Sequence, residues 1–224
     1  MDIKLKPGGG NQLQPYLAEG HGDKSGEYTN KNCTYSDFAS ESYAFCKSQY
    51  ATKTDLEKTL SKEELQSIRY YTVYENGIML NRSIRNNNLT PLQLAHVNYI
   101  VRGINKHYIG DIQVYRGISV NEEVMQDFVI AKSKQTVLTG GLICSTSRHF
   151  QRALDAAYTS RNCKYPIVFE CNLPKNTNGL PVEDIAYNRN EGEILLSAPR
   201  YKIDDIIKIS SKNKIYYKIK IHIV

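Results

Sequence analysis

Tryptophan is absent from this sequence of 224 residues and phenylalanine occurs only five times, so seventeen tyrosines supply most of the aromatic side chains. Because a tyrosine ring joins an apolar body to a polar hydroxyl, we expect some of them to line water-filled clefts. No apolar stretch approaches the length that a membrane-spanning helix needs. The composition therefore predicts no membrane span.

Cysteine and histidine do not occur in the patterns of a disulfide framework or a metal centre. The five cysteines are odd in number and form no Cys-x-x-Cys pair, and the five histidines lack the spacing of metal ligands. We therefore expect reduced thiols, a cytosolic working environment and no metal site. The cysteines are Cys33, Cys46, Cys144, Cys163 and Cys171.

Glycine-rich loops of the Walker and Rossmann types are missing as well. Gly8-Gly9-Gly10 follows no predicted strand, and Gly140-Gly141 has the form of a turn. The formal net charge of +6 is small and scattered, which suits an acidic partner or an anionic ligand. It does not indicate nucleic acid, which we do not expect as a partner.

Residues 1–31 differ from the rest of the chain. They are rich in glycine, asparagine, glutamine and lysine and contain too few apolar side chains to offset chain entropy on folding. The start of the chain also lacks the apolar core of a secretory signal peptide. We expect a flexible segment over 1–31 that carries a possible export signal, followed by one folded domain over 32–224.

The segment 54–110 is predicted to be helical. Ser61 and Glu64 have the spacing of a capping box, and Thr90-Pro91 offers an N-cap followed by proline at the first helical position. Asn76-Gly77 indicates a turn between these helices.

After residue 110 the apolar pattern changes to a period of two, interrupted by one expected helix over about 150–160. Strands are expected at Ile112–Arg116, Leu142–Ser147, Pro166–Leu173, Glu193–Ser197, Tyr201–Ile209 and Tyr217–Ile223. This order predicts an α+β fold with a largely antiparallel sheet.

Two glutamates, Glu191 and Glu193, flank Gly192 at the entry to a predicted strand. In an extended backbone their side chains project to the same side, with Cα atoms about 7 Å apart. Like charges this close need solvent or a cationic partner. The pair is either a solvated acidic surface, as in a non-enzymatic binding module, or part of a site.

Two further segments end apolar strands with polar side chains. Ser145-Thr146-Ser147 can hydrogen-bond to the backbone or orient a neighbour, and it can equally be a strand that runs into a helix cap. Arg116-Gly117 can direct a guanidinium at a phosphate, or it can be an edge arginine on a turn.

The order of these three segments resembles that of the mono-ADP-ribosyltransferases, whose signature is arginine, then Ser-Thr-Ser, then Glu-x-Glu. Arginine-specific bacterial toxins and effectors belong to this group. The resemblance covers about residues 60–224 and includes Ile68 to Thr72, with Asn81 and Arg85 downstream. Ile84 departs from the family pattern, in which leucine is usual at this place. The resemblance implies two roughly perpendicular, mostly antiparallel sheets flanked by helices, with NAD as a co-substrate and no permanently bound cofactor.

The family's residue roles are carried over by position. Glu193 would stabilise the charge that develops on the ribose when nicotinamide leaves, and Ser145 would hold Glu193 in place. Arg116 would hold NAD, and Gly117 would offer backbone bonds to the nicotinamide amide. The remaining NAD-site residues implied by the resemblance are Thr146 and Ser147, which would support the same strand.

The acceptor is expected to be an arginine of a host or target-cell protein, because the family's arginine-specific members have glutamate at the position of Glu191. Tyr187, on the preceding loop, is a candidate for contact with that protein, and Phe150 or Tyr158 for stacking on nicotinamide. We expect a monomer that is secreted without a classical signal peptide and acts in the target-cell cytosol. The alternatives are an NAD glycohydrolase, or a transferase acting on another side chain or on nucleic acid.

Overall fold

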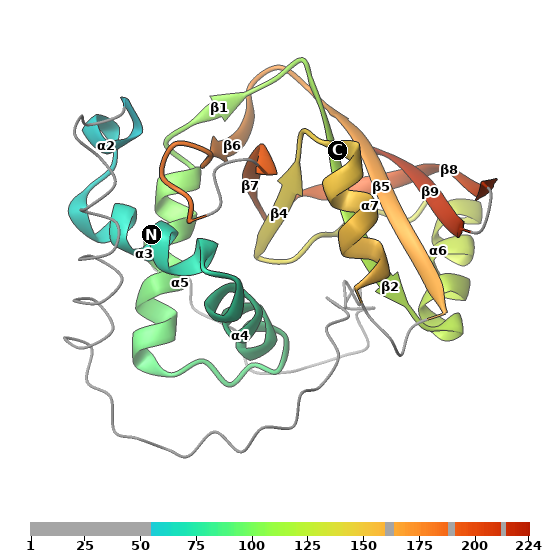
Figure 1. Cartoon of the computed structure of the whole chain (residues 1–224), viewed down its shortest axis with the longest axis horizontal. Coiled ribbons are helices and arrows are strands. Elements are labelled where there is room, and N and C mark those ends of the chain that lie inside the picture. Colours follow the sequence, from blue (N-terminus) through green and yellow to red (C-terminus); the bar gives the residue numbers. More distant parts are fainter. Residues whose placement is uncertain (1–54, 160–163, 188–190, 212–213) are drawn as a thin grey trace.

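The computed structural model describes residues 55–159, 164–187, 191–211 and 214–224, so the flexible segment expected over 1–31 lies outside the described residues. Four helices come first in the described chain and lie together at one end of the molecule (Figure 1). They are α2 (Asp55–Thr59), α3 (Lys62–Thr72), α4 (Tyr74–Arg85) and α5 (Pro91–Ile104). None of the helices in the described part of the chain is long and apolar enough to span a membrane.

Both predicted helix starts are confirmed. The Ser61 amide donates to Glu64 Oε2 at 2.8 Å, and the Glu64 amide donates to Ser61 Oγ at 3.3 Å. At the start of α5 the Thr90 hydroxyl accepts from the Gln93 amide, and Pro91 occupies the first turn. These bonds satisfy amide groups that the first turn of a helix leaves without an intrahelical acceptor.

The turn expected at Asn76-Gly77 is wrong, because α4 runs through both residues. The chain instead changes direction at Val73, which is extended and serves as the C-cap of α3 and the N-cap of α4. A Cβ atom on Gly77 would lie 2.7 Å from the Tyr71 carbonyl oxygen. The glycine therefore permits close packing of α4 against the end of α3 rather than a turn.

The strands form one continuous sheet in the order β1-β6-β7-β4-β2-β5-β9-β8-β3, not the two sheets expected from the resemblance. All pairs are antiparallel except β5 and β9, which are parallel. The residue pattern did not predict β1, β3, β6 or the helix α6. The strands are β1 (Tyr108–Ile109), β2 (Ile112–Val120), β3 (Leu138–Thr139), β4 (Ile143–Ser147), β5 (Tyr165–Leu173), β6 (Thr177–Pro181), β7 (Glu193–Ser197), β8 (Arg200–Ser211) and β9 (Lys214–Ile223).

One narrow junction joins the two halves of this sheet. Strands β2 and β4 pair at a single position, Tyr115 opposite Ser147. On either side of the junction the pairing is long, with nine residue pairs between β2 and β5 and five between β4 and β7. The two halves of the sheet are therefore joined by a single residue pair. We call this junction, on either side of which β2 and β4 do not pair, the seam.

Two helices pack mainly on the half of the sheet that contains β2. Helix α7 (Phe150–Tyr158) contacts β2, β4 and β5, and α6 (Glu122–Ser133) contacts β8 (Figure 1). Helix α6 was not predicted, although Val124, Met125, Phe128 and Ala131 bury one of its faces in the core. Helices α3 to α5 cover the other half of the sheet and enclose a separate core with β4, β6 and β7.

Candidate active site

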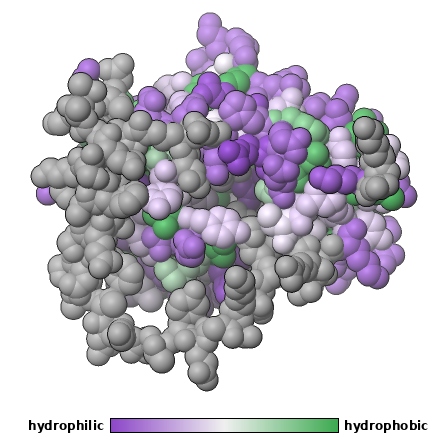
Figure 2. Space-filling model, in the orientation of Figure 1, coloured by the Kyte–Doolittle hydropathy of each residue, from purple (hydrophilic) through white to green (hydrophobic). Residues whose placement is uncertain are grey.

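A cleft of about 330 Å³ lies at the seam between β2 and β4. Its walls come from α3, α4, both halves of the sheet and α7. Figure 2 shows strongly hydrophilic side chains gathered over β4 and α7 in the middle of this face. The lining includes Tyr71, Asn81, Arg116, Ser145, Glu191 and Glu193. The volume falls in the range of small-molecule sites.

Ser145 and Glu193 meet inside this cleft. Ser145 lies on β4 and Glu193 begins β7, which pairs with β4 so that Glu193 stands opposite Ser147. The Ser145 hydroxyl donates to Glu193 Oε1 at 2.6 Å. Hydrogen bonds to a carboxylate are short and strong, so the Ser145 hydroxyl fixes the direction of the Glu193 side chain.

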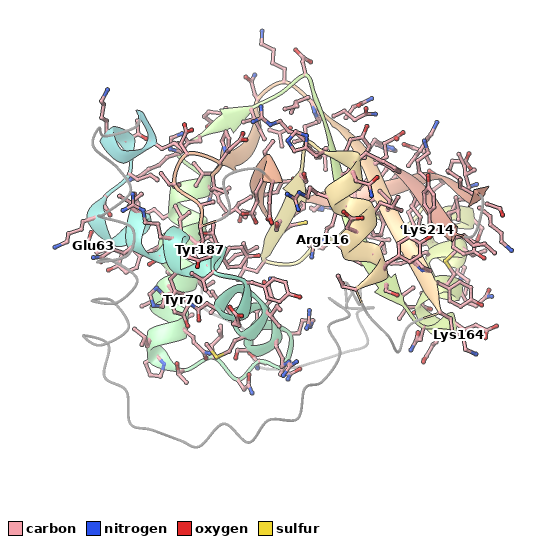
Figure 3. All side chains as sticks on the ribbon, in the orientation of Figure 1. Glu63, Tyr70, Arg116, Lys164, Tyr187 and Lys214 are labelled. Carbon is pink, nitrogen blue, oxygen red and sulfur yellow. The ribbon has the colours of Figure 1, made fainter. Side chains whose placement is uncertain are left out.

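Arg116 reaches the same point from the other side of the seam. It lies on β2, and Figure 3 shows it between β4 and α7. Its Nη1 atom donates to the Ser145 carbonyl oxygen. The structure thus brings Arg116, Ser145 and Glu193 together, although 29 residues separate the first two and 48 the last two.

The other two residues of the Ser-Thr-Ser segment hold the chain around Glu193. The buried Thr146 hydroxyl donates to the Ile194 carbonyl oxygen at 2.9 Å, which ties β4 to β7. The Ser147 hydroxyl donates to the Glu191 carbonyl oxygen at 2.5 Å and accepts from the His149 amide at 2.9 Å. Both residues line the cleft, yet these hydroxyls already have backbone partners.

Gly117 has a packing role that the sequence did not indicate. A Cβ atom at this position would lie 1.6 Å from the Ala153 carbonyl oxygen and 2.8 Å from the Ala157 nitrogen. Helix α7 can approach β2 only because this residue has no side chain. The glycine also lines the cleft, so the two uses of the position are compatible.

Glu191 and Glu193 reach the cleft by a different route from the one expected. Glu191 lies in a helical turn rather than in extended backbone, and Gly192 has a φ of 56°. Glycine favours this left-handed conformation. The extended backbone expected to project both glutamates to the same side is therefore wrong for Glu191 and Gly192, although both glutamates line the cleft.

Tyr187 and the two predicted stacking aromatics lie outside the described lining of the cleft. Tyr187 is 51% exposed, and its amide donates to the Thr72 hydroxyl at 3.2 Å (Figure 3). Phe150 packs edge-to-face on Tyr115, and the Tyr158 ring lies under Lys214 Nζ. Arg152 and Asp155 lie on the face of α7 that lines the cleft. Phe150 and Tyr158 lie on other faces of this helix.

Several lining residues were not predicted individually as site residues. Asn81 Nδ2 donates to the Tyr71 hydroxyl at 3.0 Å, which joins α3 to α4 at the cleft wall. Both residues belong to the helical motif of the resemblance, which was the available signal. Arg152 carried no signal, because it reaches the cleft only through the packing of α7 on β2. Tyr115 precedes Arg116 on β2. No group of three histidine, cysteine, aspartate or glutamate side chains that could hold a metal ion occurs in the part that the structure describes.

A family model described as ADP-ribosyltransferase exoenzyme matches residues 47–224. The chain belongs to this family. It is accordingly an ADP-ribosyltransferase of the toxin type. None of the curated proteins compared with this exoenzyme matches it.

Solved structures share the fold of this exoenzyme. Plx2a, an ADP-ribosyltransferase toxin from Paenibacillus larvae, is 21% identical with a TM-score of 0.58, and the match covers 84% of this chain and 96% of that one. An ADP-ribosyltransferase from Clostridium botulinum is 21% identical with a TM-score of 0.55, over 90% of this chain and 99% of that one. BECa of a C. perfringens binary enterotoxin, solved with NADH, is 18% identical with a TM-score of 0.58, over 82% of this chain and 48% of that one.

Proposed function

We propose that this exoenzyme cleaves NAD and transfers its ADP-ribose to an arginine side chain of a protein in another cell. The observation that carries the proposal is the Ser145–Glu193 hydrogen bond beside Arg116 in a single cleft. The structure of BECa with NADH supports NAD as the co-substrate. The toxins among the structural neighbours support secretion and action on a foreign protein.

Glu193 is the residue assigned to the cleavage step. The bond between nicotinamide and ribose breaks, nicotinamide keeps the electron pair, and positive charge develops on the ribosyl carbon. A carboxylate already aligned by the Ser145 hydroxyl can stabilise that charge without reorganising during the reaction. Glu193 acts here as an anion. Its charge stabilises the ribosyl carbon only if the side chain is held in one direction, which the Ser145 hydroxyl does.

Arg116 and Gly117 are assigned to binding of the dinucleotide. NAD carries two negatively charged phosphates, and a planar guanidinium can donate two parallel hydrogen bonds to such a group. Arg116 comes from β2 while Ser145 and Glu193 come from β4 and β7, so a ligand held by all three bridges the seam. Thr146 and Ser147 support this site through the backbone bonds that they make to β7 and its preceding turn.

Glu191 is assigned to the acceptor. An arginine side chain is protonated at any cellular pH, so its cation repels the positive ribosyl centre. A carboxylate beside the attacking nitrogen can orient the guanidinium and accept one proton as the new nitrogen–carbon bond forms. Tyr187, exposed on the loop before Glu191, is proposed to contact the target protein.

The decisive experiment is incubation of the full chain with labelled NAD and a eukaryotic cell lysate, followed by mass spectrometry of the modified peptides. We expect ADP-ribose on arginine. Label on another residue type would refute the acceptor but retain the transferase, and release of free ADP-ribose alone would indicate an NAD glycohydrolase. The matched control is Glu193→Gln, which removes the charge of the assigned carboxylate at nearly constant volume.

A further inference from the structure

The loop between β6 and β7, which carries Glu191, is held at two places by one residue outside it. Arg148 follows β4, and its amide donates to the Gly192 carbonyl oxygen at 3.0 Å. Its guanidinium Nη2 donates to Glu183 Oε2, near the other end of the loop. Arg148 thus connects the start of this loop to its end.

The part of the loop that contains Glu183 is well defined by backbone bonds. The Val182 amide donates to the Glu193 carbonyl oxygen at 3.0 Å, which closes the base of the loop. The Val182 carbonyl oxygen accepts from Ile185 at 2.9 Å and from Ala186 at 2.7 Å, which forms a tight turn around Glu183. The backbone of Glu183 is therefore held by this turn, which keeps its carboxylate near Arg148.

The end of the loop that contains Glu191 rests on the residues around Arg148. The Ser147 hydroxyl donates to the Glu191 carbonyl oxygen at 2.5 Å. The His149 ring lies against Gly192, where a Cβ atom would come within 2.9 Å of it. The backbone position of Glu191 therefore depends on the tripeptide Ser147 to His149, while Glu193 has its own support from Ser145.

We infer that the Arg148–Glu183 ion pair is a positioning device for Glu191 that sets the partition of cleaved NAD between a guanidinium acceptor and water. The inference rests on the proposed function, in which Glu193 serves cleavage and Glu191 serves transfer. Loss of the ion pair frees Arg148 from Glu183, so the tripeptide Ser147 to His149 that supports Glu191 loses its connection to the start of the loop. The Ser145–Glu193 bond stays intact. A displacement of Glu191 by about 1 Å is enough to slow transfer substantially.

The experiment compares hydrolysis with transfer in the full chain, using agmatine as a small guanidinium acceptor. In Arg148→Ala we expect kcat/KM for ADP-ribosylagmatine formation to fall about tenfold, mainly through kcat. NAD hydrolysis without agmatine should stay within about twofold of the unsubstituted chain, because an exposed ion pair contributes little to overall stability. Glu183→Gln should give the same shift in partition from the other side of the pair.

Two controls separate positioning from a general structural effect. Lys132→Ala removes an ion pair of similar exposure, Lys132 Nζ to Asp205 Oδ1 at 2.7 Å, on α6 and β8, and should change neither reaction. The charge exchange Arg148→Glu with Glu183→Arg should restore most of the transfer.

An equal loss of both reactions in Arg148→Ala, an unchanged partition, or no recovery in the exchanged pair would overturn the inference while leaving the transferase itself intact. Absence of ADP-ribosylagmatine from the unsubstituted chain has a different meaning. It would refute the arginine acceptor of the proposed function. The role inferred for the Arg148–Glu183 ion pair depends on that acceptor and would be refuted as well.

Discussion

The two halves of the sheet meet at one residue pair and are built by different means. The half that contains β2 relies on long strands, with nine pairs between β2 and β5 and ten between β8 and β9. The half that contains β4 has strands of five residues or fewer, namely β1, β4, β6 and β7, and depends on α3 to α5 to enclose its core.

This difference corresponds to a division of the site. The long-stranded half supplies Arg116 and, through α7, one wall of the cleft. The short-stranded half supplies Ser145, Glu193 and the loop with Glu191. The long-stranded half thus supplies the arginine proposed to bind NAD, and the short-stranded half supplies residues held by hydrogen bonds between β4 and β7 or the turn before β7. Chemistry is proposed only where the two halves meet.

The largest expected effect tests whether the short-stranded half carries the cleavage chemistry. Glu193→Ala should lower both NAD hydrolysis and ADP-ribose transfer by at least about a hundredfold, because the fixed charge that stabilises the transition state is lost. Both rates are measured as nicotinamide release with and without acceptor. Thermal melting serves as the control for folding. Activity within tenfold of the unsubstituted chain would remove Glu193 from the mechanism.

A second substitution separates the two glutamates. Glu191→Ala should reduce transfer to agmatine by about a hundredfold and retain most of the hydrolysis. The substitution removes the carboxylate that takes a proton from the guanidinium, and the cleavage step does not use this carboxylate. The measurement is the ratio of ADP-ribosylagmatine to free ADP-ribose. Equal loss of both products would show that the two carboxylates act as one unit, which contradicts the assigned division.

The packing of α7 on the long-stranded half is tested at Gly117. Gly117→Ala places a methyl group 1.6 Å from the Ala153 carbonyl oxygen, so α7 must move away from β2. We expect a loss of about 3 kcal/mol in the free energy of unfolding, measured by urea denaturation. Gly141→Ala, whose Cβ would lie 3.3 Å from the nearest oxygen, is the matched control. Equal stability of the two variants would contradict this packing.

The helices of the short-stranded half should respond to acid. His96 on α5 is buried, its Nδ1 lies 3.0 Å from the Ser67 hydroxyl and its ring stacks on Tyr70. Burial lowers the pKa of His96 below its usual 6.5. Between that lowered pKa and 6.5 the unfolded chain binds more protons than the folded one, so stability should fall as the pH drops below 6.5.

The midpoint of urea denaturation, measured between pH 7.5 and 5, checks this expectation. His96→Gln should flatten the pH dependence, and the part that remains includes His107, whose pKa is also lowered by burial. An identical pH dependence in the unsubstituted chain and in His96→Gln would show that groups other than His96 cause the acid response.

The smallest effect concerns the core of the long-stranded half. The Tyr201 hydroxyl is buried and has no hydrogen-bond partner in the part of the chain that the structure describes, and burial raises the pKa of Tyr201. Tyr201→Phe removes this unsatisfied group, so stability should stay constant or rise by about 1 kcal/mol. Urea denaturation measures it. A clear loss of stability would show that the hydroxyl has a partner after all.

Local features were read correctly from the chain wherever neighbouring residues decide the outcome. The caps at Ser61 and Thr90 depend on contacts within a few positions, and the strand over Tyr217–Ile223 depends on a clear alternation of apolar and polar side chains. The turn at Gly77 and the missed helix α6 show the limit. In both cases the residue pattern is compatible with more than one local structure, and packing against Tyr71 or against β8 selects among them.

The amino-acid sequence by itself determined the order Arg116, Ser145 to Ser147 and Glu191 to Glu193, and with it the family and the chemical class, because the proposed reaction needs those residue types. Only the tertiary structure decided how they meet. The single pairing of β2 with β4 opens a cleft at the seam, and Gly192 turns Glu191 toward it. Distances between residues far apart in the chain follow from the packing of whole elements, which no local pattern specifies.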